Sequence, residues 1–333
     1  MRVTYFYRSL KCGFSIKKVF NTISHEVSKN HEVREYYIPA HRADLMSVLK
    51  NIFYVFKQRD KYGINHITGD VHYCILALIG CKSVLTIHDL SAFECAGNPI
   101  KRSLLKLLWF RLPLLLADKI VCISEHTRTE VSKITKRKDI IVIYNAVDPL
   151  FKVRIKQFNV LNPRILQIGT AWNKNLVNTI KALISIPCHL VIIGSVEASV
   201  LNLLSEKKIS FVIKTNLTDN QLIEEYQNCD IVSFCSIYEG FGMPIIEANA
   251  VGRCVITSDI SPMNEIAADA ACIIDPNNVL SIKKGFIKII SEENFRNSLI
   301  NNGTINIERF NVDDISRLYI NLYSKLYSKQ ELL

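Results

Sequence analysis

Short apolar runs alternate with segments of helical period along the whole chain. In the first half the strand-like runs are VTYFY (3–7), the residues around His66-Ile67, SVLTI (83–87), KIVCI (119–123) and DIIVI (139–143). In the second half they are RILQI (164–168), HLVII (189–193), SFVI (210–213), DIVSF (230–234) and CVIT (254–257). Strands of this kind, separated by helices, are typical of parallel sheets covered by helices. The pattern therefore predicts an α/β protein.

The length and the punctuation of the chain predict two domains. A chain of 333 residues is too long for one ordinary core. Two Asx-Pro pairs, at 148–149 and 162–163, flank a mixed segment between the two groups of strands. We expect a first domain over residues 1–150, a second over 151–310, and a C-terminal helix over 311–330 that packs back on the domains. In that helix, apolar residues recur at spacings of three and four: Ile315, Leu318, Tyr319, Leu322 and Leu326.

The excess of basic residues lies entirely in the first half. Residues 1–150 hold 23 Lys and Arg against 13 Asp and Glu, whereas residues 151–333 hold 18 of each. Such an asymmetry favours an anionic partner for the first half, namely nucleic acid, an anionic membrane surface or a phosphorylated substrate. For any single lysine, a solvated surface position is the better interpretation.

The cysteines and the apolar runs indicate the cellular compartment of the protein. Its ten cysteines are scattered and include no C-x-x-C pair, so we expect buried free thiols and a reducing compartment, without a disulfide framework or zinc site. The N-terminal residues lack the apolar core of a signal peptide, and charges or a proline interrupt the apolar stretches at 71–87 and 103–117. We expect a cytoplasmic protein that does not cross a membrane.

The segment SIYEGFGMPIIEANA (236–250) places two carboxylates, Glu239 and Glu247, around seven uncharged residues. A strand leads into Glu239, two glycines make the backbone flexible, and Pro244 suits the first turn of a helix that contains Glu247. Because a flexible turn separates Glu239 from the helix that contains Glu247, both acids can point into one pocket at the carboxyl edge of the sheet, where open α/β sheets bind ligands. A carboxylate accepts two hydrogen bonds side by side, which suits the two hydroxyl groups of a vicinal diol. The exposed N–H groups at the start of a helix attract phosphate. A sugar nucleotide supplies diols and phosphate together.

The motif EGFGMPIIE resembles the E-x7-E signature of the retaining glycosyltransferases of family 4. Further landmarks of that family follow in order over nearly the whole chain: TIHDL (86–90), ISEHTR (123–128), NAVD (145–148), GTAWNKN (169–175) and SPMNE (261–265). The resemblance implies the GT-B architecture, two facing Rossmann-like domains with a central cleft. It also implies that Glu247 holds the nucleotide ribose and that the donor sugar is held by Glu239 and by the backbone of Gly240, Phe241, Gly242 and Met243.

The same resemblance assigns roles to residues outside that motif. Lys174, near the start of a predicted helix, opposes the helix dipole unless an anion lies nearby, and the donor diphosphate would supply it. Gly169 and Thr170 belong to this phosphate loop, although many relatives have a basic residue where this chain has Thr170. His88, after the strand SVLTI, corresponds to a contact to the donor sugar. Gly13 corresponds to the glycine loop of the first domain, which in relatives usually contains more glycine.

The sequence also indicates whether the reaction requires a divalent metal ion. The chain contains no Asp-x-Asp and no His/Cys cluster with metal spacing. We therefore expect no cofactor and no divalent metal, with Lys174 and backbone dipoles stabilising the departing diphosphate.

The resemblance implies a retaining transferase that moves a hexose from a GDP- or UDP-sugar to a hydroxyl of a lipid-linked oligosaccharide in surface polysaccharide synthesis. In this mechanism the diphosphate takes the proton of the acceptor hydroxyl. Similarity of the EGFGMP loop to mannosyl-transferring relatives favours mannose.

Two other functions compete with this interpretation, and one segment has two possible roles. A non-catalytic sugar-nucleotide-binding subunit of a transferase complex would keep the binding residues without turnover. A nucleic-acid-binding protein rests only on the basic half, because no recognised motif or aromatic-basic repeat supports it. The segment KRSLLKLLWFRLPLLLA (101–117) is either a helix covering a Rossmann-like sheet or a basic amphipathic helix that contacts the inner face of an anionic membrane.

Overall fold

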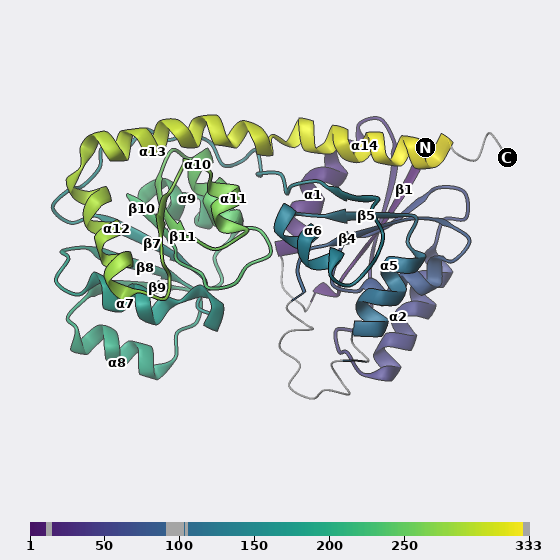
Figure 1. Cartoon of the computed structure of the whole chain (residues 1–333), viewed down its shortest axis with the longest axis horizontal. Coiled ribbons are helices and arrows are strands. Elements are labelled where there is room, and N and C mark those ends of the chain that lie inside the picture. Colours follow the sequence, from purple (N-terminus) through teal and green to yellow (C-terminus); the bar gives the residue numbers. More distant parts are fainter. Residues whose placement is uncertain (11–14, 91–102, 104–105, 329–333) are drawn as a thin grey trace. The chain divides into compact units, whose positions relative to one another are not determined.

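The computed structural model describes residues 1–10, 15–90, 103 and 106–328. The chain divides into two compact units, Met1–Ala146 with Val312–Leu333, and Val147–Asn311. Each unit contains one parallel sheet of six strands, as expected for an α/β protein (Figure 1).

The sheet of the first unit has the strand order β2-β1-β3-β4-β5-β6, with every neighbouring pair parallel. Its strands are β1 (Arg2–Tyr7), β2 (Glu32–Tyr37), β3 (Ile64–Ile67), β4 (Lys82–Ile87), β5 (Lys119–Cys122) and β6 (Ile140–Val142). Its helices are α1 (Ser15–Ser28), α2 (Leu45–Gln58), η2 (His72–Leu78), η3 (Lys106–Arg111), α5 (Leu112–Leu116), α6 (Glu125–Ser132) and α14 (Val312–Ser328).

One face of this sheet carries a cluster of buried apolar side chains. Because side chains alternate along a strand, Phe6, Ile67 and Leu85 share a face. They pack in one cluster with Val48 and Val55 of α2. Fully burying an aliphatic side chain of this kind stabilises the fold by about 1.5–3 kcal/mol, so this layer fixes α2 against the sheet.

The opposite face carries a buried layer of aromatic rings joined by hydrogen bonds. His66 Nδ1 lies 2.7 Å from the Tyr323 hydroxyl and His66 Nε2 lies 2.8 Å from Thr86 Oγ1. The Tyr323 hydroxyl in turn donates to the Tyr5 hydroxyl at 3.2 Å. Since a buried polar group without a partner is costly, this network selects one position for α14 on the sheet.

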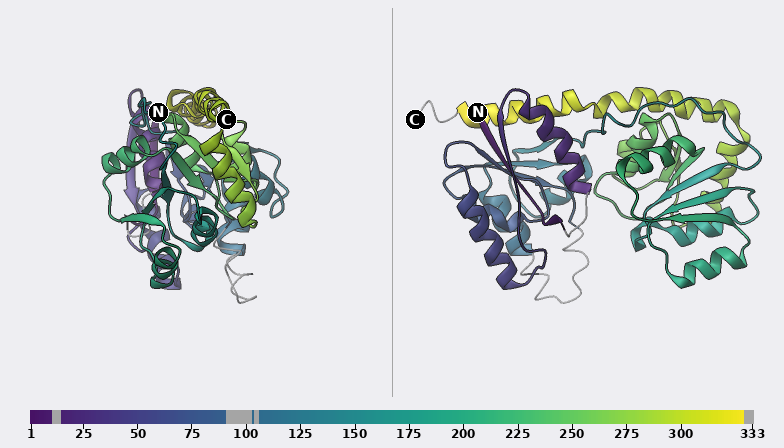
Figure 2. Two further views of the ribbon diagram at one scale, coloured as in Figure 1. Left: turned by 90° about the vertical axis from the view of Figure 1, so that its left-hand side faces the viewer. Right: turned by 180° about the vertical axis from the view of Figure 1, so that it is seen from behind.

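The C-terminal helix α14 lies beside α1, as the views in Figure 1 and Figure 2 show. Of the residues expected on its packing face, Ile315, Tyr319, Leu322 and Leu326 are buried, but Leu318 is 48% exposed. The prediction for Leu318 was therefore wrong, and Tyr323, fully buried, takes part in the packing instead. Both residues fit helical spacing, so only the aromatic layer beneath the helix distinguishes them.

The sheet of the second unit has the order β12-β11-β10-β7-β8-β9, also parallel throughout. Its strands are β7 (Arg164–Ile168), β8 (His189–Ile193), β9 (Ser210–Lys214), β10 (Ile231–Phe234), β11 (Cys254–Ser258) and β12 (Cys272–Ile274). Its helices are η4 (Trp172–Lys174), α7 (Leu176–Leu183), α8 (Ala198–Glu206), α9 (Asp219–Asn228), α10 (Met243–Ala250), α11 (Met263–Ala267), α12 (Val279–Ser291), α13 (Glu293–Asn306) and η5 (Ile307–Phe310). Helices α7, α8 and α12 share the core cluster of one face, while α10 packs on β10 and β11 and against α13.

All ten strands expected from the sequence are present, and two further strands complete the sheets. β2 has the sequence EVREYY and β12 is only three residues long. Both lie at the edge of their sheets. An edge strand needs no apolar side chains on both faces, which is why neither was identified from its pattern.

Two further observations concern the described part of the chain. Its eight cysteines are free, and all except Cys81 are buried. Among the same residues, no helix combines the length and apolar character that crossing a bilayer requires.

Burial of His66 predicts acid sensitivity. Burial lowers the pKa of His66 from 6.5 to about 3, so between these values the unfolded chain binds a proton that the folded chain does not. The free energy of unfolding therefore falls by about 1.4 kcal/mol per pH unit for this residue as the pH drops below 6.5. Urea unfolding of the wild type and His66→Gln between pH 4.5 and 6.5 measures this, and the variant should lose that part of the slope. His25→Gln, on the exposed side of α1, serves as control. An equal slope in wild type and His66→Gln would contradict the assignment.

Candidate functional site

The candidate site of the second unit lies where the strand order of its sheet reverses. From β7 the chain proceeds to β8 and β9 on one side, and then returns to place β10 on the other side of β7. The carboxyl ends of strands at such a reversal are where open α/β sheets bind ligands. The loops that follow β7 and β10 contain the predicted residues Gly169 to Lys174 and Glu239 to Met243.

Gly169 directly follows β7 and has φ of +82°, a conformation that favours glycine. A Cβ atom added at this position would lie 3.2 Å from both Cγ and Cε of Lys174. The glycine therefore allows the turn and also leaves room for the stem of Lys174. The neighbouring Thr170 donates its hydroxyl proton to the carbonyl oxygen of Ser195 at 2.5 Å, which fixes the other side of the loop.

Lys174 and Glu239 form an ion pair. Lys174 Nζ lies 2.6 Å from Glu239 Oε1, and the two side chains are only 20% and 16% exposed. The same Oε1 accepts a hydrogen bond from Asn173 Nδ2 at 3.2 Å, and Lys174 Nζ lies 4.9 Å from the centre of the Phe234 ring. We expected the donor diphosphate as the anion beside Lys174, whereas in this structure the neighbouring anion is the carboxylate of Glu239.

Three amides that the sequence analysis assigned no role fix these loops, and two of them, Asn173 and Asn175, join the loop after β7 to the segment after β10. Asn173 Nδ2 donates to the carbonyl of Tyr238 at 2.9 Å, and Gln167 Nε2 donates to that of Lys174 at 3.1 Å. Asn175 precedes α7 with φ of +56° and donates to the carbonyls of Cys235 and Pro276 at 3.0 and 2.7 Å. An asparagine directly before a helical pattern was the available signal, since Asn tolerates this left-handed conformation.

The loop after β10 turns into α10 through Gly242. This glycine has φ of +130°, and Pro244 follows in the first turn of the helix, as the sequence predicted. Phe241 is buried and packs edge-on against the ring of Phe310 at 5.8 Å. Gly240 and Met243, on either side, are partly buried. The backbone of this segment is therefore fixed by packing beneath it.

Glu247 lies on the second turn of α10, which begins at Met243. It is buried, and its Oε2 accepts a hydrogen bond of 2.5 Å from the hydroxyl of Tyr226. Burial, together with the charge of Glu247, raises the pKa of Tyr226 well above its usual value. The tyrosine thus remains a donor and holds the carboxylate in one orientation.

In the first unit, His88 follows β4 and is buried. Its Nε2 lies 2.7 Å from the carbonyl oxygen of Thr68, and burial lowers the pKa of the imidazole. Because a carbonyl oxygen only accepts, Nε2 carries the proton and Nδ1 is an unprotonated acceptor. His88 also lies against Gly69, where an added Cβ would come within 2.4 Å of the ring. Gly13 lies outside the described residues.

A small pocket opens at the carboxyl ends of β1, β2 and β3, where the first sheet also reverses its order. It measures about 120 Å³. Charged and aromatic side chains line it, among them Arg8, Arg42, Asp70, Tyr73 and Trp109. Arg8 and Asp70 are in contact as an ion pair. Such a combination can bind a sugar by stacking and by hydrogen bonds to hydroxyl groups.

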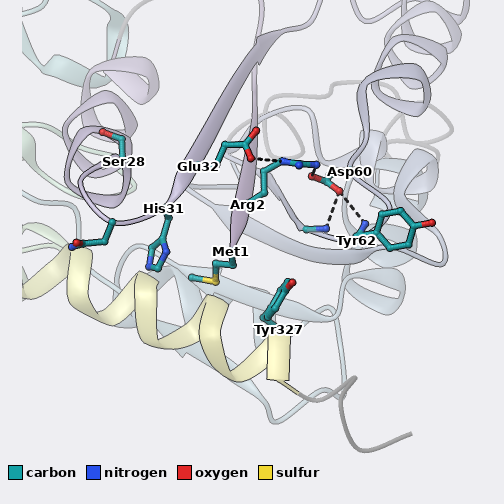
Figure 3. A pocket seen from close by; sticks show the side chains of 10 residues that line it. Met1, Arg2, Ser28, His31, Glu32, Asp60, Tyr62 and Tyr327 are labelled. Carbon is teal, nitrogen blue, oxygen red and sulfur yellow. Dashed lines mark hydrogen bonds and ion pairs between the residues drawn. The ribbon is translucent and has the colours of Figure 1, made fainter.

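A larger pocket, of about 580 Å³, lies at the opposite edge of the same sheet. Figure 3 shows Arg2 between Glu32 and Asp60, at 2.9 Å from each carboxylate. Here the strands begin, and ligands of parallel sheets bind where strands end. The guanidinium group of Arg2 is already paired with the carboxylates of Glu32 and Asp60, so we do not assign this pocket to the chemistry of the protein. Among the described residues, no three His, Cys, Asp or Glu side chains gather in a way that could hold a metal ion.

Two protein families match successive parts of the chain. Residues 153–305 match the family described as glycosyl transferases group 1, and residues 18–150 match glycosyltransferase family 4.

Two curated relatives match over most of the chain. An uncharacterized glycosyltransferase of Methanocaldococcus jannaschii is 26% identical over 246 residues, which cover 69% of this chain and 66% of that protein. The O-antigen chain mannosyltransferase RfbU of Salmonella typhimurium is 24% identical over 284 residues, which cover 80% of this chain and 74% of RfbU. The first relative is thus matched over just under two thirds of its own length.

Two solved structures share the fold at low identity. Sucrose-phosphate synthase from Thermosynechococcus elongatus superposes with a TM-score of 0.82 at 14% identity, covering 99% of this chain and 100% of that chain. HepE of Anabaena, in complex with UDP-glucose, superposes with a TM-score of 0.77 at 14% identity and covers 98% and 100%.

The space at Gly169 is tested by comparison with Gly80, which has nearly the same φ, +80°, but open space around it. Gly80→Ala should cost only the backbone strain of a left-handed alanine, about 1–2 kcal/mol. Gly169→Ala should cost more, because the new methyl group displaces Lys174. Urea unfolding of both variants gives the two losses in free energy of unfolding, and equal losses would show that Lys174 does not need the space.

Proposed function

The chain belongs to the family 4 glycosyltransferases, which have the GT-B fold, and we propose that it transfers a hexose from a nucleotide-diphosphate sugar to a lipid-linked oligosaccharide. Mannose is the preferred hexose, and a hydroxyl of the oligosaccharide accepts it. The reaction serves surface polysaccharide synthesis. The proposal rests on one observation above all. At the strand reversal of the second unit, Lys174 and Glu239 lie in contact beside a glycine turn. This pairing brings a group that binds phosphate next to a group that binds sugar hydroxyls.

The donor occupies the loops after β7 and β10. An ammonium group has three N–H donors, so Lys174 can bind a diphosphate oxygen while it keeps Glu239. Glu239 accepts hydrogen bonds from the hydroxyls of the hexose, together with the backbone of Gly240 to Met243. Glu247 receives the ribose diol, and Tyr226 orients the carboxylate for it. The nucleotide base of the donor is guanine or uracil. The mannosyltransferase relative favours mannose, which GDP-mannose would supply, while HepE was solved with UDP-glucose.

The transfer retains the anomeric configuration and needs no divalent metal. The departing diphosphate takes the proton of the acceptor hydroxyl, so no carboxylate acts as a nucleophile. Lys174 and the backbone N–H groups at the start of α10 stabilise the charge that develops on the diphosphate. The sequence supports a transfer without a divalent metal, because it contains no Asp-x-Asp motif. His88, with a neutral imidazole, contacts the donor sugar.

The acceptor binds the first unit. Its pocket at the ends of β1, β2 and β3 offers Trp109 for stacking on a sugar and Asp70 for its hydroxyls. The basic excess of residues 1–150 fits a diphosphate that links this sugar to its lipid. The O-antigen assignment of RfbU supports the same class of acceptor. A non-catalytic subunit that binds sugar nucleotides is the second candidate function, because the binding residues alone do not require turnover.

Removal of Lys174 tests the proposed reaction. Lys174→Ala should lower kcat about 100-fold or more, because the diphosphate loses a positively charged group that stabilises it as it departs. Turnover is measured as release of nucleoside diphosphate in the presence of a lipid-linked acceptor, and donor Kd is measured in parallel. Lys181→Ala, on the exposed side of α7, is the matched control and should keep full activity. Full activity of Lys174→Ala would remove this residue from the mechanism, and donor binding by the wild type without any turnover would favour the non-catalytic subunit.

A further inference from the structure

Helix α2 of the first unit is apolar on two faces. Its inner face packs in the core through Val48, Val55 and the partly buried Ile52. Asn51, also buried, exchanges two hydrogen bonds of 3.0 Å with the backbone of Ala40. The inner face is therefore fully used by the fold, and it leaves the opposite face of the helix to solvent.

The outer face of α2 exposes a continuous row of large apolar side chains, which we call the α2 stripe. Its members are Leu45, Met46, Leu49, Phe53 and Phe56, each at least 50% exposed. Spacings of three and four residues place them on one side of the helix. An amphipathic helix of a soluble domain normally presents polar residues there. A contiguous exposed apolar patch of this kind marks an interaction surface.

Basic residues flank the α2 stripe, and acidic residues are almost absent. Lys50 and Lys57 lie exposed along its side, and the Lys57 ammonium lies 4.5 Å from the centre of the Phe53 ring. Arg59 follows the helix, with its guanidinium 3.6 Å from the centre of the Phe56 ring. The helix itself contains no Asp or Glu. Asp44, just before it, is hydrogen-bonded to Ser47 as its N-cap.

The stripe has apolar and basic neighbours on the same side of the sheet. Helices α2 and α5 and the segment η3 all pack against η2. In η3 and α5, Leu107 and Leu115 are exposed. Lys106 and Arg111 lie on the same segment. This is the described part of the segment at 101–117, for which the sequence left a covering helix and a membrane-binding helix open.

We propose that the α2 stripe docks the protein on an anionic lipid bilayer, with Leu49 and Phe53 inserted among the acyl chains at the interface and Lys50, Lys57 and Arg59 placed at the headgroups. Apolar side chains beside basic ones are the composition that binds an anionic membrane surface. A second protein chain with an apolar face would have no need of basic residues along the margin of the stripe. The docking rests on α2 alone and holds whether or not the proposed transfer reaction is correct.

Vesicle sedimentation of the full chain tests this proposal without donor or acceptor. Binding should be stronger to vesicles that contain the anionic lipid phosphatidylglycerol than to pure phosphatidylcholine. It should weaken as salt is raised. Leu49→Gln with Phe53→Gln should reduce partitioning roughly tenfold or more, because the inserted apolar area is lost. Lys50→Gln with Lys57→Gln should reduce it roughly fivefold for each charge removed.

Two matched controls come from the second unit. Leu280→Gln with Ile305→Gln changes apolar residues away from the stripe that are at least as exposed as Leu49 and Phe53, and Lys181→Gln with Lys284→Gln removes two exposed lysines. Both controls should bind vesicles as the wild type does. Unchanged partitioning of the Leu49/Phe53 variant would overturn the proposal. So would a wild-type dimer, seen by light scattering, that the Leu49/Phe53 variant turns into a monomer while vesicle binding persists, because the stripe would then be a contact between copies.

Discussion

The ion pair between Lys174 and Glu239 is the interaction on which the account of the second unit depends. Both side chains are largely removed from water, and the attraction within such a pair does little more than offset its loss of hydration. The pair is therefore poorly explained by stability alone. It holds a cation and a carboxylate at one place on the sheet edge, where a ligand with phosphate and hydroxyl groups can use both. Such prior placement is what reduces the cost of reaching a reactive geometry.

The pair exists only because two features of the backbone bring its members together. Strand order places β7 beside β10, although more than sixty residues separate them in the chain. The turn at Gly169 then leaves room for the stem of Lys174. Asn173 joins the two loops by donating both to the backbone and to the Glu239 carboxylate. The same principle holds at Glu247, whose orientation is set by a tyrosine from another helix.

Much of the fold could be predicted from the sequence because buried parallel strands are continuous apolar runs. The edge strands β2 and β12 could not, since an edge does not require that pattern. The predicted site residues of the second unit follow directly after strands, so their clustering at the sheet edge could be anticipated. The partners could not be: nothing local links Tyr226 to Glu247, or identifies Glu239 as the anion beside Lys174. These are long-range contacts, which only the packing of the sheet and its helices determines.

The first unit shows the same limit in its polar core and on its surface. His66 has no local signal that separates it from a ligand, and its role emerges from the hydroxyls of Tyr323 and Thr86. The outer face of α2 reads as a second core face in the sequence, because apolar spacing does not reveal which side of a helix the protein covers.

We propose that the loops after β7 and β10 bind a nucleotide sugar. A thermal-shift screen of GDP-mannose, UDP-glucose and other nucleotide sugars tests this binding, since a ligand that binds only the folded state raises Tm by an amount that grows with the logarithm of its concentration divided by its Kd. We predict that one of these donors raises the Tm of the wild type. We also predict that Glu247→Ala loses this shift, whereas Glu206→Ala, at the exposed end of α8, keeps it. The absence of a shift with every donor, or an equal shift in Glu247→Ala, would contradict the claim.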